Sequence, residues 1–260
     1  MGTHAKQSSA TAELAQLIAG ADSVVALTGA GISVPSGIPD FRSPGTGLWE
    51  RVDPMEVAHI DAFERDPERF WSFYAQRFDV LAHKQPNDAH RALAGLERAG
   101  LLQAVVTQNV DQLHRKAGTR ELVEVHGSIA GCVCLHCGAQ VSRKQAQSRI
   151  AADPAGVPRC DDCGAALKPQ VVLFGEPLPE RALTRAQELC ARADVLLCIG
   201  SSLEVYPVAA LPELTLARGG ALAIVTKGPT PFDGVAGVRL DGDVVGELQA
   251  LLAALGVAPA

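Results

Sequence analysis

Residues 23–31 read SVVALTGAG, a short apolar run that leads directly into a glycine turn. The run predicts a buried strand over residues 23–28. Five further runs share this character, at residues 103–107, 122–125, 171–174, 195–199 and 222–225. Helices are expected around them, at residues 11–19, 93–99, 179–191 and 244–255. Strands without a polar face are covered on both sides by such helices, so the pattern predicts an α/β fold with a doubly wound parallel sheet.

Two segments interrupt this alternation of strands and helices. Residues 49–85 hold most of the aromatic side chains together with many charges, and residues 128–168 hold two close pairs of cysteines with little periodicity. We expect these insertions to form a smaller domain, made of residues 48–90 and 128–169. The larger domain then takes residues 1–47, 91–127 and 170–260.

The composition excludes several classes of protein. Of the 260 residues 47% are hydrophobic and the formal charge is only −6, which excludes a chain disordered throughout and a global basic field for nucleic acid. No apolar run approaches the roughly 20 residues that cross a bilayer. The first residues lack the apolar stretch of a secretory signal. The seven cysteines, an odd number, suit thiolate ligands in a reducing compartment. We therefore expect a cytoplasmic protein, a monomer that binds neither nucleic acid nor membrane.

Four of the cysteines form two knuckles. Two residues separate Cys134 from Cys137 and Cys160 from Cys163, and 22 residues lie between the pairs. This spacing lets four thiolates surround one zinc ion. Four thiolates leave no open position for water, so the metal is expected to be structural. The alternative is four ordinary buried thiols. Two spare candidate ligands lie nearby, Cys132 and His136.

A glycine loop follows the first predicted strand, at the end where parallel sheets bind ligands. It reads Gly29-Ala30-Gly31-Ile32-Ser33. Glycines there let backbone amides approach a pyrophosphate, whereas the alternative is a plain tight turn. The loop continues into Asp40-Phe41-Arg42, an acid, an aromatic ring and a base in a row. This set suits a site that stacks a ring and bonds its polar groups. The alternative is a solvated Asp–Arg pair with Phe41 plugging the core.

Polar side chains also follow two later strands. Gln108, Asn109 and Asp111 come after the strand at residues 103–107, where the alternative role is to cap the next helix. His126 follows the strand at residues 122–125. A lone histidine is more often structural, but imidazole is the side chain best matched to proton transfer near neutral pH. Its place at the same edge of the sheet favours a catalytic role.

In combination these motifs resemble those of the sirtuins, the NAD-dependent protein lysine deacylases. That family carries a GAGxS…SGIPDFR loop, a TQNxDxLH segment, an HG pair, two CxxC knuckles, an FGE, a GSSLxVxP segment and a late TPFD. Matches occur in the same order at residues 29–42, 107–114, 126–127, 134–163, 174–176, 200–207 and 230–233. The resemblance implies a Rossmann-like domain beside a smaller domain of helices and a zinc ribbon. NAD and an acylated-lysine protein or peptide would enter the cleft between them from opposite sides.

The resemblance also implies a role for each matched residue. His126 would act as the catalytic base, and Asn109 would fix the ribose at the reacting centre. Thr226 stands where the family often has Asn, so a hydroxyl replaces an amide near the adenosine ribose. The residues expected to bind NAD are Gly29, Ala30, Gly31, Ile32, Ser33, Asp40, Phe41, Arg42, Gln108, Asn109, Asp111, Gly200, Ser201, Ser202, Thr226, Asp243 and Val244.

The substrate side has two expected elements. The peptide backbone would add as a strand between the segments Phe174-Gly175-Glu176 and Leu203-Glu204-Val205, with contacts from Leu203 and Val205. Tyr74 and Arg77 lie three residues apart and resemble the desuccinylase subgroup, in which they bind the far carboxylate of a succinyl or malonyl group. The alternative is a packed tyrosine and a surface arginine.

The implied reaction consumes NAD. The acyl oxygen displaces nicotinamide from its ribose, and the products are free lysine, nicotinamide and O-acyl-ADP-ribose. Three alternatives stay open: a dehydrogenase, which would reduce NAD; an ADP-ribosyltransferase, which would leave label on protein; and a non-enzymatic NAD-sensing module. The presence of both His126 and Asn109 argues against mere binding, because binding needs no base.

Overall fold

The larger part of the protein is a parallel sheet. The computed structural model describes residues 2–40 and 52–260. Within them, six strands pair in the order β3-β2-β1-β7-β8-β9, and every neighbouring pair is parallel. The prediction of a doubly wound parallel sheet is therefore confirmed. The strands are β1 (Val24–Thr28), β2 (Ala104–Thr107), β3 (Leu122–Glu124), β7 (Val195–Ile199), β8 (Ala221–Val225) and β9 (Val238–Leu240).

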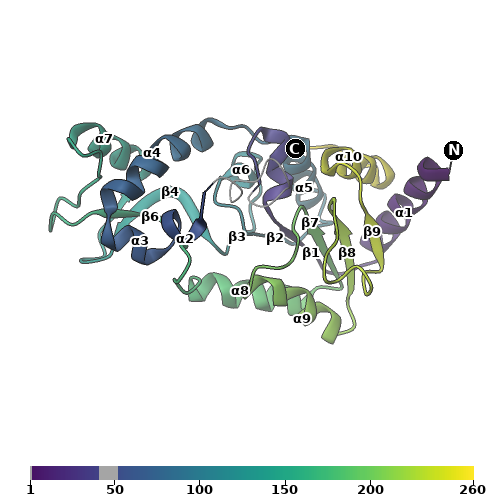
Figure 1. The fold of residues 1–260 in the computed structure, drawn as a ribbon. Helices are drawn as coiled ribbons and strands as arrows, with labels where there is room; N and C mark the ends of the chain where they lie inside the picture. Colours follow the sequence, from purple (N-terminus) through teal and green to yellow (C-terminus); the bar gives the residue numbers. More distant parts are fainter. Residues whose placement is uncertain (1, 41–51) are drawn as a thin grey trace.

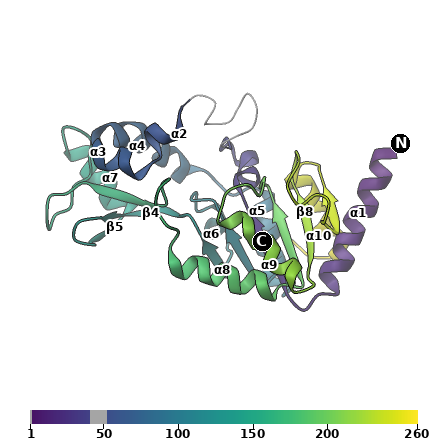
Figure 2. The same cartoon turned by 60° about the horizontal axis from the view of Figure 1, so that its bottom comes forward.

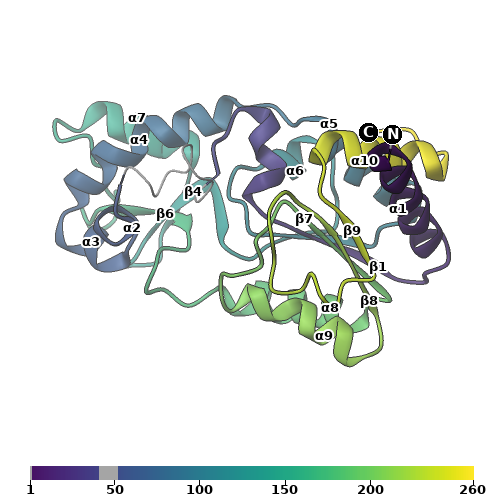
Figure 3. The same ribbon diagram turned by 45° about the vertical axis from the view of Figure 1, so that its right-hand side comes forward.

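Helices cover both faces of this sheet, as Figures 1 and 3 show. One core cluster joins the sheet to α1, α5 and α10, and a second joins its other face to α8 and α9. The central strands β1 and β7 are buried at every position, as a sheet covered on both sides requires. The covering helices are α1 (Gly2–Ala19), α5 (Asp88–Arg98), α8 (Glu180–Arg192), α9 (Leu211–Ala217) and α10 (Val244–Leu255).

Local capping explains where several helices begin and end. Asn87 precedes α5 and its side chain accepts a hydrogen bond from the Ala89 amide, so this helix begins five residues before the predicted one. Asp243 caps α10 in the same way, and Gly256 ends that helix with a φ of 65°, which suits glycine. Three short helices lie between the strands: η1 (Ala30–Ser36), α6 (Leu113–Lys116) and η3 (Val208–Ala210).

The smaller lobe has its own sheet and core, seen beside the larger sheet in Figure 2. Its three strands pair antiparallel in the order β5-β4-β6. The core is aromatic: Phe70 and Trp71 are buried, and the Trp71 indole donates a hydrogen bond to the Leu167 carbonyl at 2.9 Å. The elements are α2 (Pro54–Val57), α3 (Ile60–Arg65), α4 (Pro67–His83), β4 (Gly127–Cys134), β5 (Gln140–Ser142), α7 (Arg143–Ala152) and β6 (Leu167–Val171).

One predicted strand is wrong. Residues 171–174 do not join the parallel sheet, because β6 ends at Val171 and pairs with β4 in the small sheet. The apolar residues that follow β6 lie between other segments instead: Val172 donates a backbone hydrogen bond to His126, and Phe174 pairs with residues 58–60. Val171 and Leu173 are buried in the core of the small lobe, whereas Phe174 is exposed, and hydrophobicity alone does not distinguish this setting from the parallel sheet.

Several elements were not predicted, among them β9, α9 and α7. The strand β9 has only three residues, α9 follows β7 through η3, and α7 carries little periodicity but begins at a capping box of Ser142 and Gln145. Within residues 2–40 and 52–260, no helix combines the length and the apolar character that a bilayer crossing requires. The exact division into the two predicted domains stays a prediction.

Candidate active site

Two glycine turns meet at the carboxyl ends of β1 and β7. Thr28 and Ile199 are partners in the sheet, so the turns that follow them lie side by side. The Gly31 amide donates to the Gly200 carbonyl at 2.8 Å, and a Cβ on Gly31 would lie 2.8 Å from the Gly200 Cα. Gly200 has a φ of 59°. Glycine is required here because two backbones touch.

The amides of this loop are largely paired within the protein. The Gly29 amide donates to Ile199, and the Ile32 amide donates to the Gly29 carbonyl. Ile32 is fully buried in the core, so its contribution to a ligand site comes from its backbone. From the sequence we expect these glycines to let a pyrophosphate approach the backbone. In the structure they also allow the loop to pack against the Gly200 turn.

A buried polar network lies beneath the loop. Ser33 donates a hydrogen bond to Asp111 at 2.6 Å, and Asn109 Nδ2 donates to Ser33 Oγ at 3.2 Å and to the Gly29 carbonyl at 3.0 Å. All three side chains are at least nine-tenths buried. Burial raises the pKa of Asp111, opposed by hydrogen bonds from Ser33 and the Leu113 amide. Three predicted site residues from two segments are therefore brought together and fixed relative to one another.

His126 lies close to this network, immediately before β4. Its Nδ1 is 3.0 Å from the carbonyl oxygen of Gln108. Because a carbonyl oxygen only accepts, Nδ1 carries the proton and Nε2 has the free lone pair. Burial lowers the pKa of His126, and the bond to Gln108 opposes this shift. The Gln108 side chain donates to Ser201 Oγ at 2.9 Å, which links the Gly200 turn to the same cluster. A neutral imidazole with one basic nitrogen suits a general base.

Two histidines that the sequence argument did not single out lie under the site. The rings of His90 and His114 pack edge to face with centroids 4.8 Å apart, and both are almost wholly buried. His90 Nε2 lies 3.4 Å from Ser33 Oγ, and His114 Nε2 lies 3.0 Å from Thr28 Oγ1. In the described part of the chain, neither Nδ1 has a hydrogen-bond partner. Burial lowers the pKa of His90 to about 4 and the pKa of His114 well below its usual value.

The sequence contains little indication of this histidine pair. His114 closes the segment at residues 107–114, and His90 follows Pro86 and Asn87. His90 lies before the helix predicted at residues 93–99, and it is only in the longer helix α5 that it is buried among alanines and leucines.

The residues expected near the adenosine lie around the ends of β8 and α10. The Thr226 amide donates to the Leu240 carbonyl, and the Asp243 carboxylate accepts from the Val245 and Gly246 amides. Asp243 is therefore a helix cap as well as a candidate contact, with Val244 directly after it. Ser202 is half-buried beside Ser201. Asp40 is the last residue before residues 41–51, so Phe41 and Arg42 lie outside the described residues.

The two expected peptide-binding segments differ in how they are held. Phe174 forms a parallel bridge: its amide donates to Ala58 at 2.8 Å, and its carbonyl accepts from Ile60 at 2.9 Å. Leu203 has a φ of 55°, a strained value for leucine, and its amide donates to Ser201 Oγ at 3.2 Å. The strain indicates a conformation imposed by the surrounding structure.

Tyr74 and Arg77 lie one turn apart on α4. Tyr74 stacks on Phe78 with centroids 5.0 Å apart, and burial raises the pKa of Tyr74 to about 12 despite the nearby Arg77 charge. Arg77 folds back along the helix: Nη1 donates to the Phe73 carbonyl at 2.6 Å, and the guanidinium lies 3.6 Å above the Phe73 ring. An exposed contact of this kind is weak, so Arg77 can exchange it for a carboxylate.

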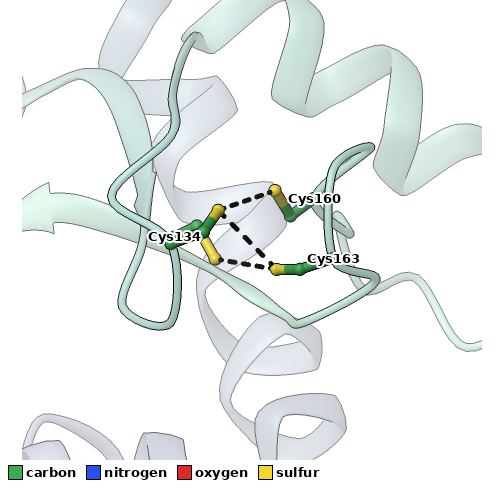
Figure 4. Close-up of side chains that lie close together, drawn as sticks. Cys134, Cys160 and Cys163 are labelled. Atoms are coloured by element: carbon green, nitrogen blue, oxygen red, sulfur yellow. Dashed lines mark hydrogen bonds between the residues drawn. The ribbon is translucent and has the colours of Figure 1, made fainter.

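The four knuckle cysteines converge at the end of the small sheet, as Figure 4 shows for Cys134, Cys160 and Cys163. All four sulfurs lie within 4.8 Å of one another, and three pairs are 3.5–3.7 Å apart. A tetrahedral zinc site with Zn–S bonds of about 2.3 Å requires sulfurs about 3.8 Å apart. The donor set fits one zinc ion closed to water. Cys132 and His136 are not part of the cluster, in the described part of the chain.

The fold and this site define a class of protein: a Rossmann-like α/β sheet whose ligand edge carries a buried Ser–Asn–Asp network and a neutral histidine, with a four-cysteine lobe beside it. The sequence model of the Sir2 family matches residues 29–207. The chain belongs to the Sir2 family.

Several relatives and solved structures agree with this assignment. The chain is 46% identical over 233 residues to NAD-dependent protein deacetylase 1 of Geobacillus kaustophilus, covering 88% of this chain and 93% of that protein. It is 43% identical over 230 residues to NAD-dependent protein deacylase 1 of Archaeoglobus fulgidus, covering 88% and 91%. A Sir2 structure with p53 peptide and NAD+ has a TM-score of 0.86 at 40% identity, covering 94% and 98%.

Proposed function

We propose that this protein is an NAD-dependent protein lysine deacylase that removes acetyl groups and also succinyl and malonyl groups. The observation that carries the proposal is the convergence of a neutral His126 with the Ser33–Asn109–Asp111 network at the ligand edge of the sheet. The relatives named as deacetylases and deacylases, at 43–46% identity, support the same activity. The products are free lysine, nicotinamide and O-acyl-ADP-ribose.

The residues at the edge of the sheet are suited to hold NAD. In this proposal the adjoining turns at Ala30, Gly31 and Gly200–Ser202 hold the phosphates, together with Arg42. The buried network below them then receives the nicotinamide end, where Ser33 and Asp111 meet the carboxamide. Asn109 and Gln108 are fixed by bonds to Gly29 and Ser201, so their remaining polar atoms are oriented before the ribose arrives.

The chemistry assigns a proton transfer to His126. Within NAD, nicotinamide is a positively charged pyridinium ring bonded to the ribose. It therefore leaves as a neutral molecule, and its departure needs no general acid. The acyl oxygen takes its place at the sugar carbon, which requires close contact and exclusion of water. His126 Nε2 then accepts a proton from a ribose hydroxyl, which attacks the acyl carbon. The bond from that carbon to the lysine nitrogen breaks, the amine leaves with a proton, and one water molecule is consumed in releasing O-acyl-ADP-ribose. The bond from Nδ1 to Gln108 keeps the ring in the orientation and tautomer that this step requires.

The finer proposal concerns which acyl groups are removed. A succinyl or malonyl group carries a carboxylate at its far end, and Arg77 offers a planar guanidinium that pairs with a carboxylate through two hydrogen bonds. Tyr74 is partly buried and its raised pKa keeps the hydroxyl protonated, so it can donate a third hydrogen bond. An acetyl group has no carboxylate and so contacts neither Arg77 nor Tyr74 in this way. The site still accepts an acetyl group, but without the affinity that these contacts add.

The proposal is tested with one peptide carrying acetyl-, succinyl- or malonyl-lysine, incubated with NAD and followed by mass spectrometry. We expect deacylated peptide and O-acyl-ADP-ribose in equal amounts. Absorbance of reduced nicotinamide would support a dehydrogenase, and radioactive label retained on protein from labelled NAD would support an ADP-ribosyltransferase. Either result without deacylation overturns the proposal. A rate of NAD consumption that is the same with and without the acyl peptide also overturns it.

A cytoplasmic location and a monomeric state stay predictions. Four closely placed thiols support a reducing compartment, because thiolate ligands persist there. Size-exclusion chromatography with light scattering measures the oligomeric state directly.

A further inference from the structure

A buried lysine lies next to the expected peptide-binding segment. Lys168 is on β6 and its side chain is only 5% exposed. Its ammonium group donates to the carbonyls of Pro169 at 3.1 Å and Val171 at 2.7 Å, and to Glu176 Oε2 at 2.9 Å. All three donors of the ammonium therefore have acceptors. A buried charge is tolerated only when paired in this way, so the arrangement is specified by the surrounding structure.

The Glu176 carboxylate also closes a turn. The same Oε2 accepts a hydrogen bond from the Leu173 amide at 2.8 Å, and the Glu176 amide donates to the Leu173 carbonyl at 3.1 Å. Glu176 thus holds both polar groups of the Leu173 backbone. Its charged end is directed inward to Lys168, away from a role as a direct peptide contact.

The residues inside the turn are fixed from the other side. Phe174 is paired through both backbone groups with residues 58–60. Gly175 has a φ of 86°, and a Cβ there would lie 2.7 Å from His59 Nε2, so the chain passes the His59 ring without room for a side chain. The turn is held between this bridge and the Lys168–Glu176 pair.

We propose that Lys168 and Glu176 are positioning residues that hold the Gly175 backbone in place for pairing with the peptide backbone. The inference deepens the proposed function and rests on it. A peptide that adds as a strand gains affinity from main-chain hydrogen bonds, which require a partner backbone of fixed position. Loss of the pair therefore weakens peptide binding, although neither side chain touches the peptide.

The test compares two substrates of different length in the variant E176Q. This change keeps the shape of the side chain but removes the charge that Lys168 requires. With an acetylated peptide of about ten residues, we expect the KM for peptide to rise about tenfold, as when a charge-assisted hydrogen bond is lost. The KM for NAD stays within twofold of wild type. With N- and C-capped acetyl-lysine, which has no flanking residues to pair, wild type and variant have equal kcat/KM.

Matched variants separate positioning from general stability. E188Q removes the acid of an exposed pair with Arg185 on α8 and should leave every parameter unchanged. E176D keeps the charge and shortens the side chain, so it should restore part of the peptide affinity, and it replaces E176Q if that variant does not fold. An equal loss on both substrates, or a fall in kcat with the peptide KM unchanged, overturns the proposal. Absence of deacylation by wild type instead overturns the proposed function, and this inference with it.

Discussion

His126 Nδ1 lies 3.0 Å from the Gln108 carbonyl oxygen, and this contact decides which ring nitrogen is available for chemistry. The proton resides on Nδ1, so the free lone pair belongs to Nε2. Gln108 itself is tied through its side chain to Ser201. The His126 ring is therefore oriented by the two strand-end segments that we propose to bind NAD.

Replacement of His126 tests its assignment as the base. In H126A we expect deacylation to fall by about 10²–10⁴-fold, the usual contribution of a general base, while NAD still binds. Mass spectrometry of O-acyl-ADP-ribose measures the reaction, and calorimetry measures NAD binding. The matched control is H83A, because His83 is exposed at the end of α4 and should have no effect. Wild-type deacylation in H126A contradicts the mechanism.

The pH dependence of the rate follows from the same residue. Burial lowers the pKa of His126 below its ordinary value of 6.5. Above this pKa the imidazole is neutral and can accept a proton, and below it the base is blocked. We expect kcat/KM to fall as the pH falls through the lowered pKa, with the midpoint of the acidic limb below 6.5. The measurement is kcat/KM from pH 5 to 8, with thermal unfolding at each pH to confirm that the enzyme stays folded. An acidic midpoint above 7 contradicts the assignment.

Arg77 tests the acyl selectivity. In R77M we expect kcat/KM for succinyl peptide to fall at least tenfold, because a charge-assisted pair with the far carboxylate is lost. The rate on acetyl peptide should stay within twofold, since acetyl has no carboxylate. Y74F is expected to give a smaller loss in the same direction. An unchanged succinyl rate in R77M means that Arg77 only covers Phe73, as it does without substrate.

The acid stability of the fold tests the buried histidine pair. Burial lowers the pKa of His90 to about 4 in the folded state, whereas an unfolded histidine has a pKa of about 6.5. Between these values the unfolded chain binds the extra proton, so stability from neutral His90 is present above pH 6.5 and is lost as the pH falls toward 4. For His90 alone we expect a loss of about 2 kcal/mol between pH 7.5 and 5. Urea unfolding at several pH values measures it.

Variants identify which group causes the dependence of the unfolding free energy on pH. H90N removes the titrating ring, so the loss of unfolding free energy between pH 7.5 and 5 should become smaller than in wild type. H83N changes an exposed histidine and should leave the slope unchanged. Equal slopes in H90N and wild type would show that other groups govern the acid transition.

The sequence predicted the structure correctly where a feature is determined by residues that are close together in the chain. The run before Gly29 and the glycine turn predict β1 and its ligand edge, and C-x2-C spacing predicts the thiol cluster, because backbone geometry determines which side chains converge. The sequence did not predict the structure where burial depends on segments that are far apart in the chain. Val171 and Leu173 are apolar because they are buried in the core of the small lobe. The strand β9 has only three residues, pairs with β8 at the edge of the sheet and packs its side chains into the core shared with α1.

The same distinction holds within the site. Motif matches and strand ends predict that Ser33, Asn109 and Asp111 lie together, and the structure joins them by hydrogen bonds. The inward orientation of Glu176 was not predictable, since it depends on a lysine eight residues earlier on another element. The close approach of Gly31 to Gly200 likewise requires the register of β1 with β7.

Removal of the metal ligands tests the four-cysteine site. We expect one zinc ion per chain in wild type and none in C163A, because three thiolates and a water hold zinc far less tightly than four. Cys134 ends β4, so a bound ion would cross-link this strand to the loop that precedes β6. We therefore expect the melting temperature of C163A to fall by more than about 5 °C. The matched control is C132A: Cys132 is buried in the core of the same lobe but lies outside the cluster, and zinc should remain. Metal analysis measures the zinc content, and calorimetry measures the melting temperature. Loss of zinc from C132A together with retention of zinc by C163A would contradict the assignment of the ligands.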